Sequence, residues 1–336
     1  MDRVTLAAGD LTAEIWTLGA CVNNLIAPDR SGNLDSIVLG YASEADRRAG
    51  ESYLGEIVGP FANRIAAGGY RIDGQQFTPA LNDSGSSTLH GGPTGISTHD
   101  WTILEQAPDS VQLHLDWEDP SSGFAGPIHI DIEYLLSGDG LRHAVTAKSE
   151  APVPLSIVSH PYFNLAGSTC ATIGEHRLTV PASVYLPIDQ ASIPLADAPQ
   201  PTAGTPFDFT VSRDLRSAFG SADPQVSAHG GVDHALIVDG QGWRQAAQLD
   251  CPGTGRRLSI WTDYPAIQVY TGQFLDSTTI SHPHGCGGRY SGVALETEEY
   301  PDAPRRADFP NTVVRPGQLY QRQTSWLLST DASDLS

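Results

Sequence analysis

The chain has 336 residues, of which 39 are Asp or Glu and 19 are Lys or Arg, giving a formal net charge of −20. That charge is repelled by phosphate backbones and by anionic membrane surfaces, so nucleic acid and membranes are not expected partners. The 34 Gly and 24 Pro divide the sequence into many short segments with little room for long helices, which indicates an all-β protein. A neutral ligand is not penalised by the charge, whereas a phosphorylated one needs a local basic pocket.

Alternation of apolar and polar residues predicts the strands. At 111–118 every odd position is apolar and every even one polar, and 128–134 repeats this alternation. Asp-Gly pairs at 73–74 and 139–140 are typical of tight hairpin turns. A turn or two of helix is expected at 43–48, opened by a Ser43 cap. In chain order the predicted strands are 11–18, 36–41, 111–118, 128–134, 177–185, 234–239, 244–250, 256–262, 266–271, 292–299 and 319–328.

The chain is expected to form one domain of stacked antiparallel sheets. No internal repeat, linker or low-complexity segment divides residues 1–329, and the polar residues 330–336 are expected to fray. His114 and His129 occupy polar positions of alternating strands, so both are expected on a solvated face.

The cysteines and the apolar segments predict the compartment. Cys21, Cys170, Cys251 and Cys286 are widely spaced and form no CxxC pair, which fits a reducing compartment. Acidic residues interrupt the apolar residues of the first 16 positions, unlike in a signal peptide. No apolar run reaches the roughly 20 residues of a membrane-spanning helix. A soluble, cytoplasmic protein is therefore expected.

His160 is the first candidate for chemistry. It lies within an aromatic and aliphatic segment, 159–167, directly before Pro161. A side chain that titrates near neutral pH at the end of an apolar element suits proton transfer to a small neutral molecule. The alternative is a structural, half-buried histidine bonded to the backbone.

Two further segments carry candidate groups. His90 precedes Gly91 and Gly92, and paired glycines would let the backbone approach a ligand closely. Glu296 ends an apolar run, where an isolated charge is too costly to keep. It therefore has either a shifted pKa or a buried partner such as Arg64 in a structural ion pair.

Cofactor and metal motifs are sparse. The sequence has no GxSxG elbow, no Walker loop, no GxGxxG after a strand and no HExxH, which leaves acid–base chemistry without a cofactor. His282, His284 and Cys286 place three potential ligands within five residues, but their loop is rich in Gly and Pro and has no second cluster nearby in sequence. A surface loop is favoured there, and no metal is expected.

Taken together, these segments resemble the aldose 1-epimerase, or galactose mutarotase, family from about Leu11 to Trp326. Any one motif is weak, but the ordered set is highly specific. The motifs are Ala27-Pro28-Asp29-Arg30, Val38-Leu39-Gly40-Tyr41, Gly59-Pro60-Phe61-Ala62-Asn63-Arg64-Ile65, Leu89-His90-Gly91-Gly92, His160-Pro161-Tyr162-Phe163-Asn164-Leu165, Val232-Asp233-His234, Gln268-Val269-Tyr270-Thr271-Gly272-Gln273-Phe274-Leu275-Asp276, Leu295-Glu296-Thr297 and Arg315-Pro316-Gly317.

The resemblance implies a β-supersandwich with a sugar bound in an open cleft, and interconversion of the α and β anomers of free galactose or glucose without cofactor or metal. It implies that Glu296 is the general base for the anomeric hydroxyl and that His160 is the general acid for the ring oxygen. His90 is then a second catalytic or polarising imidazole. The hydroxyl-binding residues that it implies are Arg64, Asn63, Asp233 and Gln268.

Departures from the family leave alternatives open. Pro60 stands where an arginine or another residue is common, Gln273 where Asn is usual, and Glu298-Glu299 where a Gln is frequent, and 281–289 is unusually rich in His, Pro and Gly. These departures put the preferred sugar in doubt, and the added negative charge argues weakly against a phosphosugar. A hexose-6-phosphate 1-epimerase and a non-catalytic carbohydrate-binding relative remain alternatives. The sequence does not decide between a monomer and a homodimer.

Overall fold

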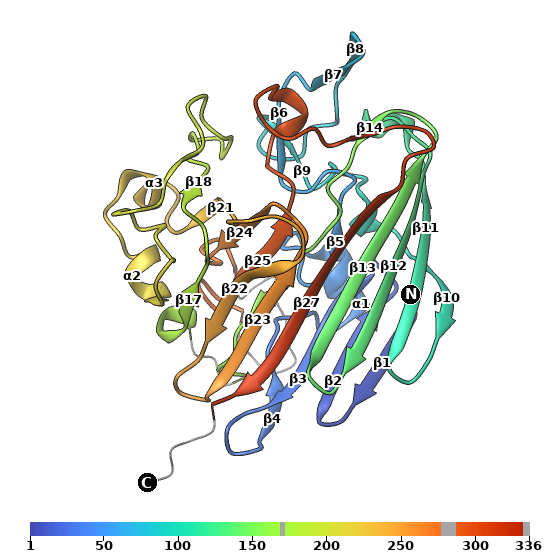
Figure 1. Ribbon diagram of the computed structural model, residues 1–336. Helices are drawn as coiled ribbons and strands as arrows, with labels where there is room; N and C mark the ends of the chain where they lie inside the picture. The colour runs from blue at the N-terminus through green and yellow to red at the C-terminus, as the bar shows by residue number, and fades with distance from the viewer. Residues whose placement is uncertain (169–171, 277–286, 332–336) are drawn as a thin grey trace.

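The structure is a computed structural model that describes residues 1–168, 172–276 and 287–331. Antiparallel sheets dominate it, and the all-β prediction is confirmed (Figure 1). The helices are short: α1 (Glu44–Ala49), α2 (Leu215–Phe219), α3 (Pro224–Ser227) and the 3₁₀ turns η1 (Ile96–Thr98), η2 (Pro120–Ser122), η3 (Ile173–Glu175) and η4 (Ala303–Arg305). No helix in the described part of the chain is long and apolar enough to cross a membrane.

The largest sheet has nine strands and runs across the front of the molecule in Figure 1. Its order is β10 (Thr102–Gln106), β11 (Ser110–Trp117), β12 (Ile128–Ser137), β13 (Gly140–Ser149), β27 (Tyr320–Thr330), β23 (Arg256–Thr262), β22 (Arg244–Asp250), β17 (Arg177–Thr179) and β20 (Arg213–Asp214). Strand β27 lies between β13 and β23, so it pairs with one strand from the middle of the chain and with one from its last third.

A six-stranded sheet lies behind β23 and β27, and a four-stranded sheet packs on the β11–β12 end (Figure 1). The six strands are, in order, β16 (Tyr162–Phe163), β25 (Val293–Glu298), β24 (Ala266–Tyr270), β21 (Asp233–Ile237), β18 (Val184–Tyr185) and β19 (Gln200–Pro201). The four strands are β1 (Arg3–Ala8), β2 (Leu11–Trp16), β3 (Cys21–Pro28) and β4 (Leu34–Ser36).

Short two-stranded ladders connect the sheets. They are β5 (Ile57–Val58) with β15 (Val158–Ser159), β6 (Arg64–Ala66) with β9 (Ser87–Leu89), β7 (Tyr70–Ile72) with β8 (Gln75–Phe77), and β14 (Val153–Pro154) with β26 (Val313–Val314). The first two ladders lead directly into His160 and His90.

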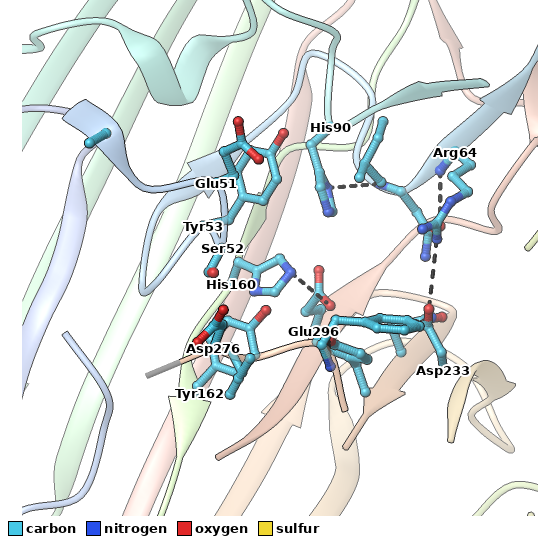
Figure 2. A pocket seen from close by; sticks show the side chains of 17 residues that line it. Glu51, Ser52, Tyr53, Arg64, His90, His160, Tyr162, Asp233, Asp276 and Glu296 are labelled. Carbon is cyan, nitrogen blue, oxygen red and sulfur yellow. Dashed lines mark hydrogen bonds and ion pairs between the residues drawn. The ribbon is translucent and has the colours of Figure 1, made fainter. Parts of the chain in front are cut away.

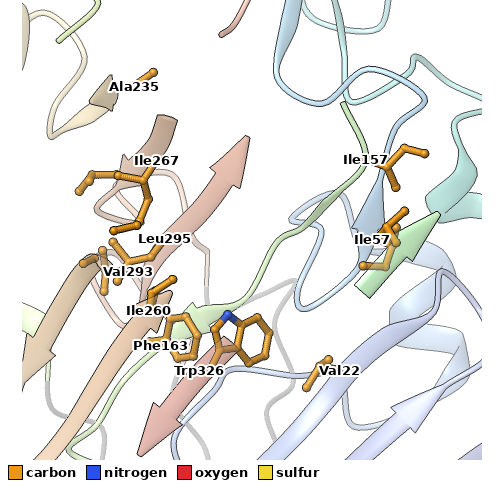
Figure 3. Packing of buried hydrophobic residues seen from close by; sticks show 14 of the residues in the cluster. Val22, Ile57, Ile157, Phe163, Ala235, Ile260, Ile267, Val293, Leu295 and Trp326 are labelled. Atoms are coloured by element: carbon orange, nitrogen blue, oxygen red, sulfur yellow. The ribbon is translucent and has the colours of Figure 1, made fainter. Parts of the chain in front are cut away.

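The main core lies between the nine-stranded sheet and the six-stranded and four-stranded sheets, and Figure 3 shows part of it. The rings of Phe163 on β16 and Trp326 on β27 meet edge to face, with centroids 5.2 Å apart. Val293 and Leu295 of β25 point into this core. Because side chains alternate along a strand, residues 294, 296 and 298 must project from the opposite face of β25.

Most predicted strands agree with the structure. The intervals 244–250 and 256–262 coincide with β22 and β23. The interval 266–271 exceeds β24 by one residue at its end, and 292–299 exceeds β25 by one residue at each end. Helix α1 follows the predicted cap, since the Ser43 hydroxyl accepts a hydrogen bond from the Asp46 amide. His114 and His129 lie on the partly solvated outer face of the nine-stranded sheet, as predicted.

Two strand predictions and one turn need correction. Residues 36–41 form no continuous strand, because their backbone bonds to Leu25 on one side and to Tyr162 on the other. The interval 177–185 is broken at Pro181, which has no N–H, and the chain passes there from one large sheet to the other. The second hairpin turns at Gly138 and Asp139, one position earlier than predicted.

Candidate active site

All seven residues predicted for the site line one open cavity of about 570 Å³ (Figure 2). The sheets and ladders bring them together from six separate segments of the chain. They are Asn63, Arg64, His90, His160, Asp233, Gln268 and Glu296.

One face of the six-stranded sheet forms the floor of the cavity. Gln268 on β24 lies directly opposite Glu296 on β25, and Asp233 on β21 lies opposite Tyr270. The opposite face of these strands belongs to the core, so alternation alone directs the polar side chains into the cavity. The alternation of side chains along these strands therefore separates the site residues from the core residues.

His160 and Glu296 form the central pair. His160 Nε2 lies 3.3 Å from Glu296 Oε1, and both side chains are nearly fully buried. Burial lowers the pKa of His160 to about 4. Burial also raises the pKa of Glu296 well above its usual value; the Asp233 charge raises it further, and the Arg64 charge lowers it. Low polarity thus favours the neutral forms of both groups. Glu296 Oε2 and His160 Nδ1 have no hydrogen-bond partner among the described residues.

The backbone of His160 is fixed from β5. Its N–H donates to the Glu56 carbonyl, and its own carbonyl accepts from the Gly55 N–H, both at 2.9 Å. The short β15–β5 ladder therefore sets where the imidazole enters the cavity. The imidazole ring itself faces Glu296.

His90 is held in one tautomer by Asn63. The Asn63 backbone N–H donates to His90 Nδ1 at 3.1 Å. In return, the His90 backbone N–H donates to the Asn63 carbonyl at 3.0 Å. An Nδ1 atom that accepts a hydrogen bond leaves the ring proton on Nε2. Burial, with His160 and Arg64 nearby, lowers the pKa of His90 well below its usual value. His90 is thus a neutral imidazole with an Nε2–H donor.

The glycines after His90 serve a different purpose from the one predicted. A Cβ on Gly91 would lie 2.0 Å from the Gly59 carbonyl oxygen, and one on Gly92 would lie 2.9 Å from the Ala80 carbonyl oxygen. The close approach that glycine permits is therefore between backbone segments, and neither glycine lines the cavity. This packing fixes the loop that presents His90.

Arg64 links two carboxylates at the side of the cavity. Its Nε lies 2.7 Å from Asp83 Oδ2 and its Nη1 lies 3.8 Å from Asp233 Oδ2. Burial opposes the charge of Arg64, but these carboxylates outweigh it and raise its pKa. The predicted alternative of a structural Arg64–Glu296 ion pair is wrong, since the Arg64 guanidinium pairs with Asp83 and Asp233 and the Glu296 carboxyl group faces His160.

Gln268 orients Asp233. Its Nε2 donates to Asp233 Oδ1 at 2.7 Å, while its buried Oε1 has no partner among the described residues. The two side chains present a fixed set of donors and acceptors beside Glu296, an arrangement that suits hydroxyl groups.

Aromatic residues that were not predicted for the site complete the cavity. The Tyr53 ring lies 4.7 Å from that of His90, and the Tyr162 ring lies 5.0 Å from that of His160. Tyr162 and Tyr270 each follow a predicted site residue by two positions, so the period of a strand could have indicated them. Tyr53 and Asp83 lie in irregular segments that gave no such signal.

The two histidines and Glu296 are also close enough to be considered as metal ligands. Their ligand atoms lie within 4.8 Å of one another. A metal needs a bare imidazole nitrogen, however, and the Asn63 amide keeps the proton of His90 on the nitrogen that would face the ion. The donor set therefore fits a divalent cation poorly. The segment with His282, His284 and Cys286 lies outside the described residues.

Comparisons with known proteins agree with this geometry. A family model described as aldose 1-epimerase matches residues 2–326. Galactose mutarotase from Homo sapiens is 31% identical over 97% of this chain and 93% of its own, and aldose 1-epimerase from Escherichia coli K12 is 32% identical over 92% and 89%. The crystal structure of an aldose epimerase homologue from C. elegans superposes with a TM-score of 0.89, at 27% identity over 98% and 99% of the two chains. This chain belongs to the aldose 1-epimerase family.

Proposed function

We propose that this protein interconverts the α and β anomers of free aldohexoses of the galactose or glucose type. One observation carries the proposal, namely that His160 Nε2 faces Glu296 Oε1 at 3.3 Å within a cavity lined by hydroxyl-binding groups. Anomer exchange needs one group to take the proton of the anomeric hydroxyl and another to protonate the ring oxygen. The two oxygens are bonded to the same carbon, so a pair of adjacent groups can serve both.

Ring opening follows from the placement of that pair. Glu296 takes the O1 proton as the carboxylate, while His160, as the protonated imidazolium, donates its Nε2 proton to O5 and becomes neutral. The O1–H electrons form the C1=O1 double bond, and the C1–O5 electrons pass to the new O5–H bond. After rotation about C1–C2, the same transfers run in reverse on the other face of the aldehyde. The step converts a charged pair into the neutral pair that burial favours.

The other polar groups position the sugar. His90 stays a neutral imidazole because burial holds its pKa well below the usual value, and it polarises a sugar oxygen by donating a hydrogen bond from Nε2. Arg64, Asp233, Gln268 and Asn63 bind hydroxyls, and their mutual hydrogen bonds fix their orientation before the sugar arrives. No residue role in this scheme calls for a cofactor.

Polarimetry tests the proposal directly. Freshly dissolved α-D-glucose and α-D-galactose are expected to approach their equilibrium rotation faster with the protein than with the same protein after heat denaturation. A panel of free aldoses that shows no acceleration would contradict the proposal. Binding without acceleration would instead indicate a non-catalytic carbohydrate-binding relative.

Sugar phosphates are disfavoured by the charges of the cavity. Among its described lining residues Arg64 is the one Lys or Arg, and it is already paired with Asp83 and Asp233. Besides Asp233, the lining carries the carboxyl groups of Glu51, Asp276 and Glu296, and each of them repels a phosphate when it is ionised. In a coupled anomer assay we therefore expect less acceleration with glucose 6-phosphate than with glucose, and the reverse preference would favour a hexose-6-phosphate 1-epimerase.

Metal removal should not affect the reaction. Because the His90 tautomer disfavours a cation at the central cluster, exhaustive chelation followed by gel filtration is expected to leave the rate of mutarotation unchanged. A loss of activity that zinc restores would contradict this expectation and would indicate a metal site, for which His282, His284 and Cys286 are the candidate ligands.

The compartment and the partners of the protein are part of the proposal. A small-molecule sugar is the expected partner, and the charge of −20 argues against nucleic acid and anionic membranes. The cytoplasm is the proposed location, which the unpaired, buried thiols of Cys21 and Cys251 support.

A further inference from the structure

Glu298 places a second carboxyl group on the face of β25 that carries Glu296. The two residues are two positions apart, so their side chains project from the same face. Glu298 has no solvent exposure, and it does not line the cavity. The Asn63 side-chain N–H donates to Glu298 Oε1 at 3.2 Å, and Glu298 Oε2 has no hydrogen-bond partner among the described residues. The scheme above gives this group no role.

The surroundings of Glu298 favour its neutral form. An ionised carboxylate would leave a charged oxygen buried without a donor, which costs more than an unpaired neutral hydroxyl. Glu296 on the same strand and Asp233 on β21 repel a charge at this position, and only Arg64 on β6 attracts one. Burial and the Glu296 charge raise the pKa of Glu298 well above its usual value, against the opposing effect of the Asn63 hydrogen bond.

Glu298 is connected to His90 through Asn63. Besides its bond to Glu298, the Asn63 side chain accepts the Arg64 N–H at its Oδ1 at 2.9 Å. The Asn63 backbone, at a φ of 59°, exchanges two hydrogen bonds with His90. A left-handed backbone conformation is uncommon outside glycine and needs support from its surroundings. The two side-chain bonds of Asn63 supply such support, and one of them ends at Glu298.

We propose that Glu298 is a positioning residue that acts as a neutral carboxylic acid: it holds the Asn63 side chain and, through the Asn63 backbone, the His90 tautomer that donates from Nε2. This inference rests on the proposed function, because its kinetic readout is the rate of mutarotation. It separates the two carboxyl groups of β25 by role, since Glu296 must ionise to act as a base and Glu298 must not.

Two variants of similar volume test the positioning role. Glu298→Gln keeps an acceptor for the Asn63 N–H and a neutral group in place of the acid, whereas Glu298→Leu removes the acceptor. We expect Glu298→Leu to lower kcat about tenfold, the factor typical of losing one hydrogen bond at a buried polar group. Glu298→Gln should recover most of that loss. Full activity in Glu298→Leu, or equal losses in both variants, would overturn the positioning role.

The pH profile tests the protonation state. If Glu298 is neutral, Glu298→Gln changes no charge, and the acid limb of kcat against pH stays where it is in the wild type. If Glu298 were ionised, the substitution would remove a negative charge near Glu296, lower the pKa of Glu296 and move the acid limb to lower pH, which would overturn the proposal. This comparison decides the matter even if Glu298→Leu fails to fold.

A spectroscopic measurement keeps this inference separate from the proposed function. The infrared difference spectrum between wild type and Glu298→Gln at neutral pH should contain the carbonyl band of a protonated carboxylic acid. A carboxylate band in its place would overturn the inference whether or not the protein accelerates mutarotation. An absence of mutarotation with the acid band present would contradict the proposed function alone.

Discussion

Replacing Glu296 by Gln is expected to lower kcat for mutarotation by a factor of about 10² to 10⁴, the range typical of removing a positioned acid–base group. The amide has the size of the acid but cannot take the O1 proton. It also removes the carboxylate that lies 3.3 Å from His160 Nε2. The proton that His160 gives to O5 then has no carboxylate beside it to stabilise the imidazolium. KM should change by only a few fold, because Arg64, Asp233 and Gln268 keep their mutual contacts.

A matched substitution on the surface controls for the amide itself. Glu133 lies at an exposed position of β12, and Glu133→Gln makes the same chemical change on a strand far from the cavity. Polarimetry at neutral pH, with thermal unfolding to verify the fold, should show wild-type rates for Glu133→Gln. A rate for Glu296→Gln within a few fold of the wild type would exclude Glu296 as the base.

Local sequence period predicted the parts of the fold that are themselves local. Strand β11 alternates polar and apolar residues along its length, and its predicted limits, 111–118, differ from the observed ones by one residue at each end. The segment 36–41 has a strand-like composition but bonds alternately to Leu25 and to Tyr162, more than a hundred residues apart. No local pattern records that choice of partners.

The same distinction applies to the site. The seven residues predicted through the family resemblance all line one cavity, but their contacts could not be read from the chain. The bond between Asn63 and Glu298 joins positions 235 residues apart, and Arg64 finds Asp83 in an irregular loop. All six residues of β25 are buried, Glu298 among them, and the sequence does not show that this strand is covered on both faces.

A buried ion pair stabilises the segment that forms one wall of the cavity. Arg47 Nη2 lies 3.0 Å from Glu56 Oε2, and the side chains are 6% and 2% exposed. The Tyr41 hydroxyl donates to Glu56 Oε1 at 2.9 Å, and Arg47 also donates to the Ser97 carbonyl. Helix α1, which carries Arg47, leads directly into the segment with Ser52 and Tyr53 that lines the cavity.

The pair makes the stability of the fold depend on pH. Burial raises the pKa of Glu56 to about 7, against the opposing effects of Arg47 and Tyr41. Between its usual value of 4.5 and about 7 the folded state therefore binds a proton that the unfolded state releases. The contribution of this group to stability is full below 4.5 and is lost as the pH rises through 7. Without Arg47, the pKa of Glu56 would be higher still.

Arg47→Ala is accordingly expected to lower the free energy of unfolding by about 3 to 5 kcal/mol at pH 8, the usual cost of breaking a buried pair from one side. The loss should be smaller at pH 5.5, where Glu56 takes up a proton and no charge is left unpaired. Denaturant unfolding at both pH values measures this, with Arg48→Ala as the control. Arg48 is 52% exposed and its pair with Glu44 is worth only about 0.3 to 0.5 kcal/mol.

Equal, small losses for both variants would mean that the buried pair does not support the cavity wall. A loss for Arg47→Ala that does not vary with pH would mean that Glu56 is not the group left unpaired.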